Sequence, residues 1–365
     1  MKTLLIKATI FTFFILSAGC VAQKSLAPDA EASRVKNIIF FIGDGMGTAQ
    51  VYAGMTASST PFYLEKFPYS GFSKTYSSDN YVTDSGAGGT ALATGKKTKN
   101  GMIGMDPDST AVNSVVALAS KNGLATGVLS TSAVNHATPA SFVAHNVSRN
   151  NYEEIALDFV EGGPDVFIGG GLSSFNERED GRDLTAELRS LGYDVVFNTD
   201  DLKKSESDKI AGLLSKEHMP RVSEGREGVL KEMTAKAIET LSRNKDGFFL
   251  MVEGSMIDWG GHDRDKEYII SEMIDLDEAI GVAYDFAVRD GETLIVVTAD
   301  HETGGMSLPA GDIKGKRVAA SFIESGNHTA VMVPVFSYGP AAERFSGIHD
   351  NTFFFGEFLR LLNIR

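Results

Sequence analysis

Short apolar runs recur along the chain between longer stretches whose apolar residues repeat at helical spacing. A short continuous apolar run is typical of a strand that is buried on both faces of a sheet. Because parallel strands need crossover helices, the alternation predicts an α/β fold with a doubly wound, mostly parallel central sheet and helices on both faces. The predicted strands lie at Ile38–Ile42, Ala125–Leu129, Val166–Ile168, Val195–Phe197, Phe248–Val252, Leu294–Val297 and Val331–Phe336, and the helical stretches include Thr110–Asn122, Tyr152–Glu161, Leu230–Asn244 and Glu267–Asp290.

One stretch departs from this alternation. Residues 172–229 are charged and less regular, and we interpret them as a small lobe inserted into the core fold. The periodic segments on either side predict one domain over residues 37–365. Apolar residues make up 42% of the chain, which suffices for a substantial core.

The first residues have the pattern of an export signal. Lys2 and Lys7 precede an apolar stretch from Ala8 to Leu16, which is followed by small residues up to Cys20. The apolar stretch is too short to span a bilayer, so residues 1–19 are predicted to be a signal that is removed. We therefore expect the mature protein in the periplasm or outside the cell.

Two processing routes fit the residues after the signal. Cys20 lies where a bacterial lipoprotein is cleaved and lipidated, which predicts a lipid anchor, whereas a plain cleavage after Ala22 leaves a soluble protein. Residues 20–36 are small and polar and are interpreted as a tether. With one cysteine in the chain an internal disulfide cannot form, so stability must come from packing or metals.

The charge of the chain argues against nucleic acid as a partner. The chain has 34 Lys and Arg against 48 Asp and Glu, a formal net charge of −14, and loss of Lys2 and Lys7 with the signal makes it −16. Such a surface repels a phosphate backbone. An anionic small molecule would need positive charge supplied locally.

Three predicted strands are each followed by side chains that can hold a metal. Carboxyl ends of neighbouring parallel strands meet at one edge of a sheet, where ligands usually bind. One such loop could be ordinary, with an aspartate that caps a helix, but three together favour a metal site. The residues are Asp44 after the first strand, Glu253, Asp258 and His262 around the end of the fifth, and Asp300 and His301 after the sixth.

A serine in a run of small residues is the predicted nucleophile. Asp84 and Ser85 precede Gly86-Ala87-Gly88-Gly89, and a helix that begins at Ser85 would place its hydroxyl among free backbone N–H groups, which suits a phosphoryl group. A purely structural role as a helix cap is the alternative. Serine needs a histidine base or a metal to become nucleophilic, and the metal-ligand loops favour the second route.

Together these segments resemble the alkaline phosphatase family. The resemblance rests on motifs that occur in family order along the mature chain. They are Gly43-Asp44-Gly45-Met46-Gly47, Asp84-Ser85-Gly86-Ala87, His136-Ala137-Thr138-Pro139-Ala140, Arg149, Glu253-Gly254-Ser255-Met256-Ile257-Asp258, His262, Thr298-Ala299-Asp300-His301 and Gly326-Asn327-His328-Thr329. The resemblance implies an alkaline-phosphatase-like catalytic domain over residues 37–365 that hydrolyses phosphate monoesters with two zinc ions and one magnesium ion.

The resemblance also implies a role for each site residue. Ser85 would be phosphorylated in the intermediate, and Arg149 would grip the phosphate, with Asp84 and Trp259 also at the substrate. The first zinc would be held by Asp258, His262 and His328, the second by Asp44, Asp300 and His301, and the magnesium by Asp44, Thr138 and Glu253. Sets that contain nitrogen suit zinc, and sets made of oxygen suit magnesium.

Three features depart from the family pattern. His136, expected just behind the magnesium ligands, stands where some bacterial relatives carry Asp, and Trp259 stands where they carry Lys. The segment from Thr303 to His328 is too short for the large crown-like insertion of many relatives. A homodimer, common in the family, is compatible with the resemblance but not implied by any residue here.

Three other enzymes of the same superfamily and a phosphate-binding lipoprotein are the alternatives to this function. A sulfatase would need a Cys or Ser before x-Pro-x-Arg, but Gly-Ala-Gly follows Ser85. Related phosphodiesterases generally use Thr as nucleophile and lack the equivalent of Arg149, and a phosphoglycerate mutase is a third enzyme of the same superfamily. A lipoprotein that only binds phosphate would need no nucleophile.

Overall fold

A ten-stranded sheet forms the centre of the computed structural model, which describes residues 34–364. From one edge to the other, its strands are β14 (Gly347–Asp350), β2 (Tyr69–Lys74), β13 (Val333–Tyr338), β8 (Thr293–Thr298), β1 (Asn37–Gly43), β7 (Phe248–Gly254), β3 (Ala125–Ala133), β4 (Val166–Gly170), β6 (Ile210–Leu213) and β5 (Asp194–Val196). Only β13 runs antiparallel to its neighbours among these strands. The mostly parallel sheet predicted from the sequence is confirmed.

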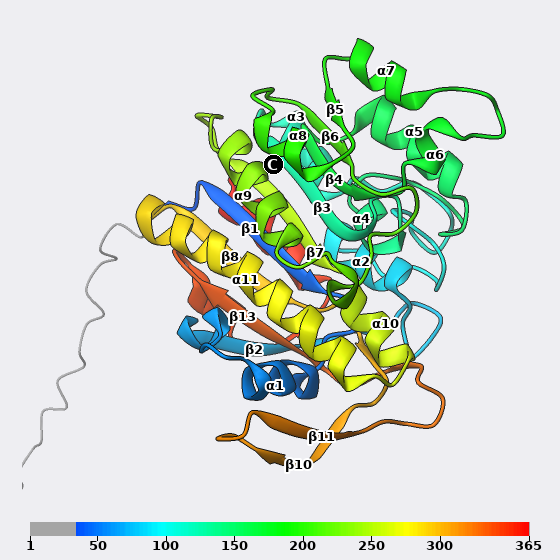
Figure 1. Ribbon diagram of the computed structural model, residues 1–365. Helices are drawn as coiled ribbons and strands as arrows, with labels where there is room; N and C mark the ends of the chain where they lie inside the picture. Colours follow the sequence, from blue (N-terminus) through cyan, green and yellow to red (C-terminus); the bar gives the residue numbers. More distant parts are fainter. Residues whose placement is uncertain (1–33, 365) are drawn as a thin grey trace, which may run out of the picture. The chain divides into compact units, whose positions relative to one another are not determined.

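Helices cover both faces of this sheet (Figure 1). On one face lie α1 (Thr48–Ala57), α8 (Thr199–Lys204), α9 (Val229–Leu241), α10 (Met256–His262) and α11 (Lys266–Asp290), and on the other lie α2 (Ser85–Thr94), α3 (Val115–Lys121), α4 (Ala137–Ala140), α5 (Tyr152–Gly162), α6 (Ser173–Asn176), α7 (Leu184–Ser190) and α12 (Phe353–Leu361). Short 3-10 helices are η1 (Tyr63–Lys66), η2 (Val222–Glu224) and η3 (Ala342–Phe345). The doubly wound arrangement is thereby confirmed.

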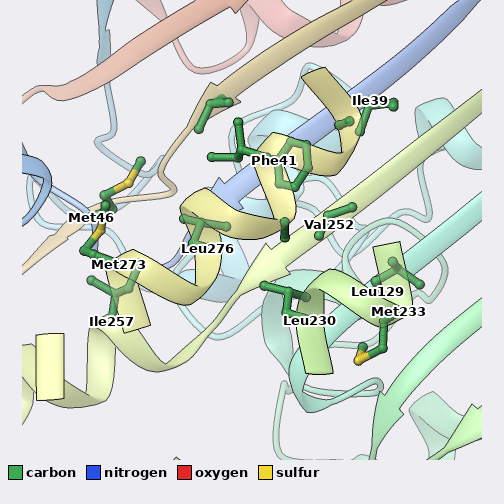
Figure 2. Packing of buried hydrophobic residues seen from close by; sticks show 14 of the residues in the cluster. Ile39, Phe41, Met46, Leu129, Leu230, Met233, Val252, Ile257, Met273 and Leu276 are labelled. Atoms are coloured by element: carbon green, nitrogen blue, oxygen red, sulfur yellow. The ribbon is translucent and has the colours of Figure 1, made fainter. Parts of the chain in front are cut away.

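The sequence of β1 explains why it lies in the middle. Every residue of Asn37–Gly43 is buried. Ile39 and Phe41 pack under α11, whereas Ile38 and Phe40 point to the opposite face, against α12 and α3. A strand that is apolar on both faces can be buried only between two helical layers. Figure 2 shows Phe41 and Leu276 of α11 among the buried side chains of the first of these layers.

The predicted inserted lobe, residues 172–229, contributes two strands to the central sheet. β6 pairs in parallel with β4, and β5 pairs in parallel with β6, so the two strands extend the central sheet at one edge. Apolar residues such as Ala211 and Leu213 join the same core as β4 and α5. The lobe thus shares the sheet of the main domain.

Two small sheets complete the fold. β10 (Ser307–Asp312) and β11 (Arg317–Ser321) form a hairpin in the segment that is short for a crown-like insertion. β9 (Glu302–Thr303) pairs with β12 (His328–Thr329). Between residues 34 and 364 no helix is both long and apolar enough to cross a bilayer. The predicted export signal, Cys20 and most of the tether lie outside the described residues.

Candidate metal and phosphate site

The predicted site residues leave the carboxyl ends of four neighbouring strands. Asp44 follows β1, Glu253 ends β7, Asp300 and His301 follow β8, and Thr138 lies shortly after β3. These strands are adjacent in the order β8, β1, β7, β3. The sheet therefore brings together residues that are far apart in the sequence, as the three strand ends predicted.

Two histidines face each other through their Nε2 atoms. Nδ1 of His262 lies 2.9 Å from the carbonyl oxygen of Gly326, and Nδ1 of His328 lies 3.0 Å from that of Thr83. A carbonyl can only accept, so each Nδ1 carries a hydrogen, and in the neutral ring each Nε2 presents a lone pair. The two Nε2 atoms are 3.2 Å apart, and both lie within 3.4 Å of a carboxylate oxygen of Asp258. This arrangement fits a cation between them.

A second group of possible metal ligands lies around the ring of His301. Its Nδ1 is 3.2 Å from Thr303 Oγ1, and that hydroxyl donates to Asp258, so His301 must donate through Nδ1. Its Nε2 then faces Asp44 Oδ1 at 3.4 Å and Asp300 Oδ2 at 3.2 Å. Among the described residues neither carboxylate oxygen has a hydrogen-bond partner. A buried acceptor with no donor is expected where a metal binds.

The third group consists mainly of oxygen atoms. Thr138 Oγ1 lies 3.4 Å from Asp44 Oδ2, and Glu253 Oε2 accepts hydrogen bonds from Ser130 and Ser255. Glu253 Oε1, which is buried, has no partner in the part of the chain that the structure describes. Ligand atoms of Asp44, Glu253 and His136 lie within 4.8 Å of one another. The set suits a hard cation such as magnesium.

Three buried carboxyl groups of the site, those of Asp44, Glu253 and Asp300, are harder to ionise than usual. Burial, with the charge of Asp300 nearby, raises the pKa of Asp44 well above its ordinary value. Burial likewise raises the pKa of Glu253 to about 7 and that of Asp300 to about 6. So many carboxyl groups can be ionised together only if cations compensate them.

Ser85 is the first residue of α2, and Asp84 is its N-cap. Asp84 Oδ1 accepts a hydrogen bond from the N–H of Ala87 at 2.9 Å, so Asp84 takes the capping role that was the alternative for Ser85. Ser85 Oγ lies 3.2 Å from His301 Nε2. A side chain at Gly88 would come within 3.1 Å of Asp300, so the small residues let α2 pack directly against the metal-ligand loop. The hydroxyl is thereby held at the predicted ligands.

Arg149 lies on the other side of Asp84. Its Nη1 donates to Asp84 Oδ2 at 3.0 Å, and its Nη2 donates to His136 Nε2 at 3.1 Å. Burial and the positive charge of Arg149 hold the pKa of His136 well below its ordinary value, so the imidazole is neutral and can accept. Although burial opposes it, the Asp84 carboxylate raises the pKa of Arg149. The guanidinium is therefore fixed, charged and at the site.

Comparison with known proteins decides the family. The alkaline phosphatase family model matches residues 35–321, most of the chain. The chain belongs to the alkaline phosphatase family. Alkaline phosphatase 4 of Bacillus subtilis is 33% identical, over 93% of this chain and 92% of the relative. As a family member the protein is a phosphomonoester hydrolase with metal-binding residue groups.

Solved alkaline phosphatases have the same fold. The enzyme from the Antarctic bacterium TAB5 is 41% identical, with a TM-score of 0.87 over 92% of this chain and 100% of that chain. A mutant of the TAB5 enzyme with a histidine-to-aspartate substitution has magnesium bound in its M3 site, and it is 40% identical with the same TM-score and the same coverage of both chains.

His218 is one of the residues beside this site that sequence reasoning missed. His218, interpreted as surface or structural, lies with its ring centroid 4.7 Å from Trp259 and 5.4 Å from His136. Its Nδ1 accepts from the N–H of Ala133 at 3.0 Å, at the end of β3. No motif or spacing marks His218, because it comes from the predicted lobe and reaches the site only through the sheet. His145 and His349 instead contact the carbonyl groups of Val112 and Ser346.

Proposed function

We propose that the protein hydrolyses phosphate monoesters to an alcohol and inorganic phosphate through a phosphoserine at Ser85, with two zinc ions and one magnesium ion. The observation that carries this proposal is that the Nε2 atoms of His262, His301 and His328 all face the site. The Nε2 atom of His301 lies beside the Ser85 hydroxyl. Nitrogen and carboxylate ligands next to a serine suit metal-activated phosphoryl transfer.

Each ion has a ligand set that its chemistry favours. The proposed sets are Asp258, His262 and His328 for the first zinc, Asp44, Asp300 and His301 for the second, and Asp44, Thr138 and Glu253 for magnesium. The unpartnered oxygens of Asp44, Asp300 and Glu253 support the last two sets. The magnesium recorded in the M3 site of a TAB5 mutant supports the choice of that ion.

The ions would also change the sign of the net charge of the site. Asp44, Asp84, Glu253, Asp258 and Asp300 with Arg149 sum to −4, and the six charges of two zincs and one magnesium would bring this to about +2. When bound, the ions would lower the pKa of nearby hydroxyl groups and stabilise negative charge on leaving oxygens. An acidic protein would thereby acquire a pocket for a phosphate dianion.

The proposed reaction consists of two displacement steps, in which Ser85, Arg149 and Asp84 have different roles. In the first, Ser85 Oγ attacks phosphorus, the ester P–O bond breaks, and the alcohol leaves. In the second, water attacks the phosphoserine and returns Ser85 to its hydroxyl form with release of phosphate. Arg149 would orient two nonbridging oxygens, and Asp84 would hold Arg149 while capping α2. Because both nucleophiles must lose a proton, activity should rise toward alkaline pH.

Elemental analysis combined with a monoesterase assay tests the proposal. The purified protein should contain zinc and magnesium, release phosphate in excess of its own amount, and lose activity on chelation. A monoester, a diester and a sulfate ester assayed side by side should give the monoester as the preferred substrate. Phosphate binding without turnover would favour a binding protein, and preference for the diester or sulfate ester would favour another member of the superfamily.

Replacing Arg149 with alanine should weaken binding of both inorganic phosphate and substrate. A charge-assisted contact is lost from each, at a cost on the order of 1.5–3 kcal/mol, and zinc content should not change. The phosphate inhibition constant of Arg149→Ala measures the effect, and Arg182→Ala, an exposed arginine paired with Glu187, is the matched control. Unaltered phosphate inhibition would show that Arg149 does not touch the phosphate.

His136→Asp combined with Trp259→Lys should tighten inhibition by phosphate and strengthen retention of magnesium. Trp259 offers one donor and no charge, whereas lysine can donate to phosphate. His136 is a neutral acceptor for Arg149 near the magnesium set, whereas aspartate would add a negative charge there. Turnover should fall if product release limits it. The phosphate inhibition constant and the magnesium dependence of activity are measured in both single variants and the double variant, and no change in either would refute the charge argument.

We further propose export to the periplasm or beyond and a catalytic domain over residues 37–365. Mass spectrometry of the mature protein distinguishes lipidation at Cys20 from cleavage after Ala22. A homodimer is compatible with the family and is tested by light scattering.

A further inference from the structure

A buried carboxylate lies behind the proposed zinc ligands. Glu302, next to His301, is 3% exposed. Its Oε1 accepts from Gln50 Nε2 at 2.8 Å and from the N–H of Met306 at 3.1 Å. Its Oε2 accepts from the N–H of Gly305 at 3.2 Å and from the Thr329 hydroxyl. Four donors thus converge on one carboxylate.

All four donors are neutral groups. Within residues 34–364 no arginine, lysine or histidine forms an ion pair with Glu302. A buried charge is unfavourable unless its hydrogen-bonding capacity is filled, and here it is filled by donors that each need an acceptor. A carboxylate is the side chain that only accepts, so it satisfies two N–H groups, an amide and a hydroxyl at once.

The donors belong to three of the four chain segments that carry the predicted zinc ligands. Gln50 is on α1, just after Asp44, and its Nε2 also donates to the carbonyl of Thr303. Gly305 and Met306 belong to the loop after His301. Thr329 directly follows His328 and is the register partner of Glu302 in the β9–β12 pair.

We propose that Glu302 is a positioning residue that fixes His301 and His328 relative to Asp44, so that the zinc ligands are preorganised before a metal binds. The backbone around Asp44 supports this assignment. A Cβ at Gly47 would lie 2.5 Å from Cγ of Glu302, so the loop is built to pack on this side chain. Hydrogen bonds that orient metal ligands commonly change metal affinity by roughly 10–100-fold when they are lost.

The test compares zinc release from variants of the full protein. In Glu302→Gln one oxygen becomes an NH₂ group that faces donors, so at least one of the four hydrogen bonds is lost. Zinc transfer to a chromophoric chelator should become at least about tenfold faster, and the visible spectrum of the cobalt-substituted protein should change. Thr329→Val removes one donor and should shift both readouts less, in the same direction. Because Thr329→Val removes only one hydrogen bond, it still tests the assignment if Glu302→Gln folds poorly.

A buried carboxylate away from the site serves as the matched control. Glu272 is 2% exposed and pairs with Arg226, so Glu272→Gln should lower the stability of the fold without changing zinc release. Equal acceleration in Glu272→Gln and Glu302→Gln, or unchanged release and cobalt spectra in both Glu302→Gln and Thr329→Val, would overturn the assignment. The inference rests on the proposed zinc sites: a wild-type protein that binds no zinc would refute those sites themselves, which is a different outcome.

Discussion

Replacing Ser85 with alanine should lower kcat for phosphate monoesters by on the order of 10³-fold or more, while the metals stay bound. The reason is the position of the hydroxyl. It begins α2, where backbone N–H groups point outward, and it lies 3.2 Å from Nε2 of His301. Alanine removes the nucleophile but keeps the helix start and the Asp84 cap, so the ligand loops packed on α2 should not move.

Trapping the intermediate tests the same residue directly. The wild-type protein is incubated with labelled phosphate at acidic pH, where the phosphoserine should accumulate, and the label is mapped by peptide analysis. Ser120→Ala, which changes an exposed serine on α3, should retain activity and labelling. Label on a residue other than Ser85, or near-normal turnover by Ser85→Ala, would eliminate the proposed intermediate.

In the metal-free protein, replacing Glu253 with glutamine should stabilise the fold at pH 8 by on the order of 3 kcal/mol, and by much less at pH 5. Burial raises the pKa of Glu253 to about 7 from an ordinary value of 4.5. The unfolded chain therefore loses this proton first, and the folded wild type loses stability as pH rises from about 4.5 to 7. Glutamine has no proton to lose, so the difference between the two proteins should grow across that window.

Urea unfolding in the presence of a chelator at pH 5, 6, 7 and 8 measures this difference. With zinc and magnesium present the sign should reverse, because the carboxylate then becomes favourable as a ligand and glutamine is a poor substitute. A difference in stability that is constant over the pH range would show that folding does not raise the pKa of Glu253.

The central strands could be predicted from the sequence because burial on both faces leaves a continuous apolar run, as in β1 and β7. The edge strand β14 and its neighbour β2 could not, although β5 at the other edge was predicted at Val195–Phe197. β2 alternates buried and exposed residues and includes the exposed Phe72, and β14 has no buried residue. Such strands are specified by pairing with a neighbour rather than by their own composition. β6 is apolar and buried throughout, but it is only four residues long and lies in a segment that is otherwise charged, so its pattern did not predict a strand.

Helix boundaries show a related limit. Helical spacing predicts a helix over Thr110–Asn122, but α3 begins at Val115. Ala111 forms a β-bridge with Met105, and the Ser114 hydroxyl accepts from the N–H of Ala117, which starts the helix there. Long-range pairing of the first residues thus overrides their local pattern.

The site was predictable where motifs carry the chemistry. The structure brings the predicted metal ligands, Ser85, Arg149, His136 and Trp259 to one edge of the sheet, although their individual roles stay predictions. Residues that act through other residues left no such signal. Ser130, Ser255 and Thr303 contact Glu253 or Asp258 only because the fold places them there. His218 reaches Trp259 from a segment with no recognisable pattern.

The position of β1 between β7 and β8 also limits how far the residues at the ends of these strands can move. All three strands are fully buried, and Asp44 and Asp300 leave directly from their ends, so backbone hydrogen bonds set the spacing of these groups. Amide hydrogens in β1 should exchange with solvent only when the whole domain unfolds. Asp44 and Asp300 should therefore keep their spacing for as long as the domain stays folded.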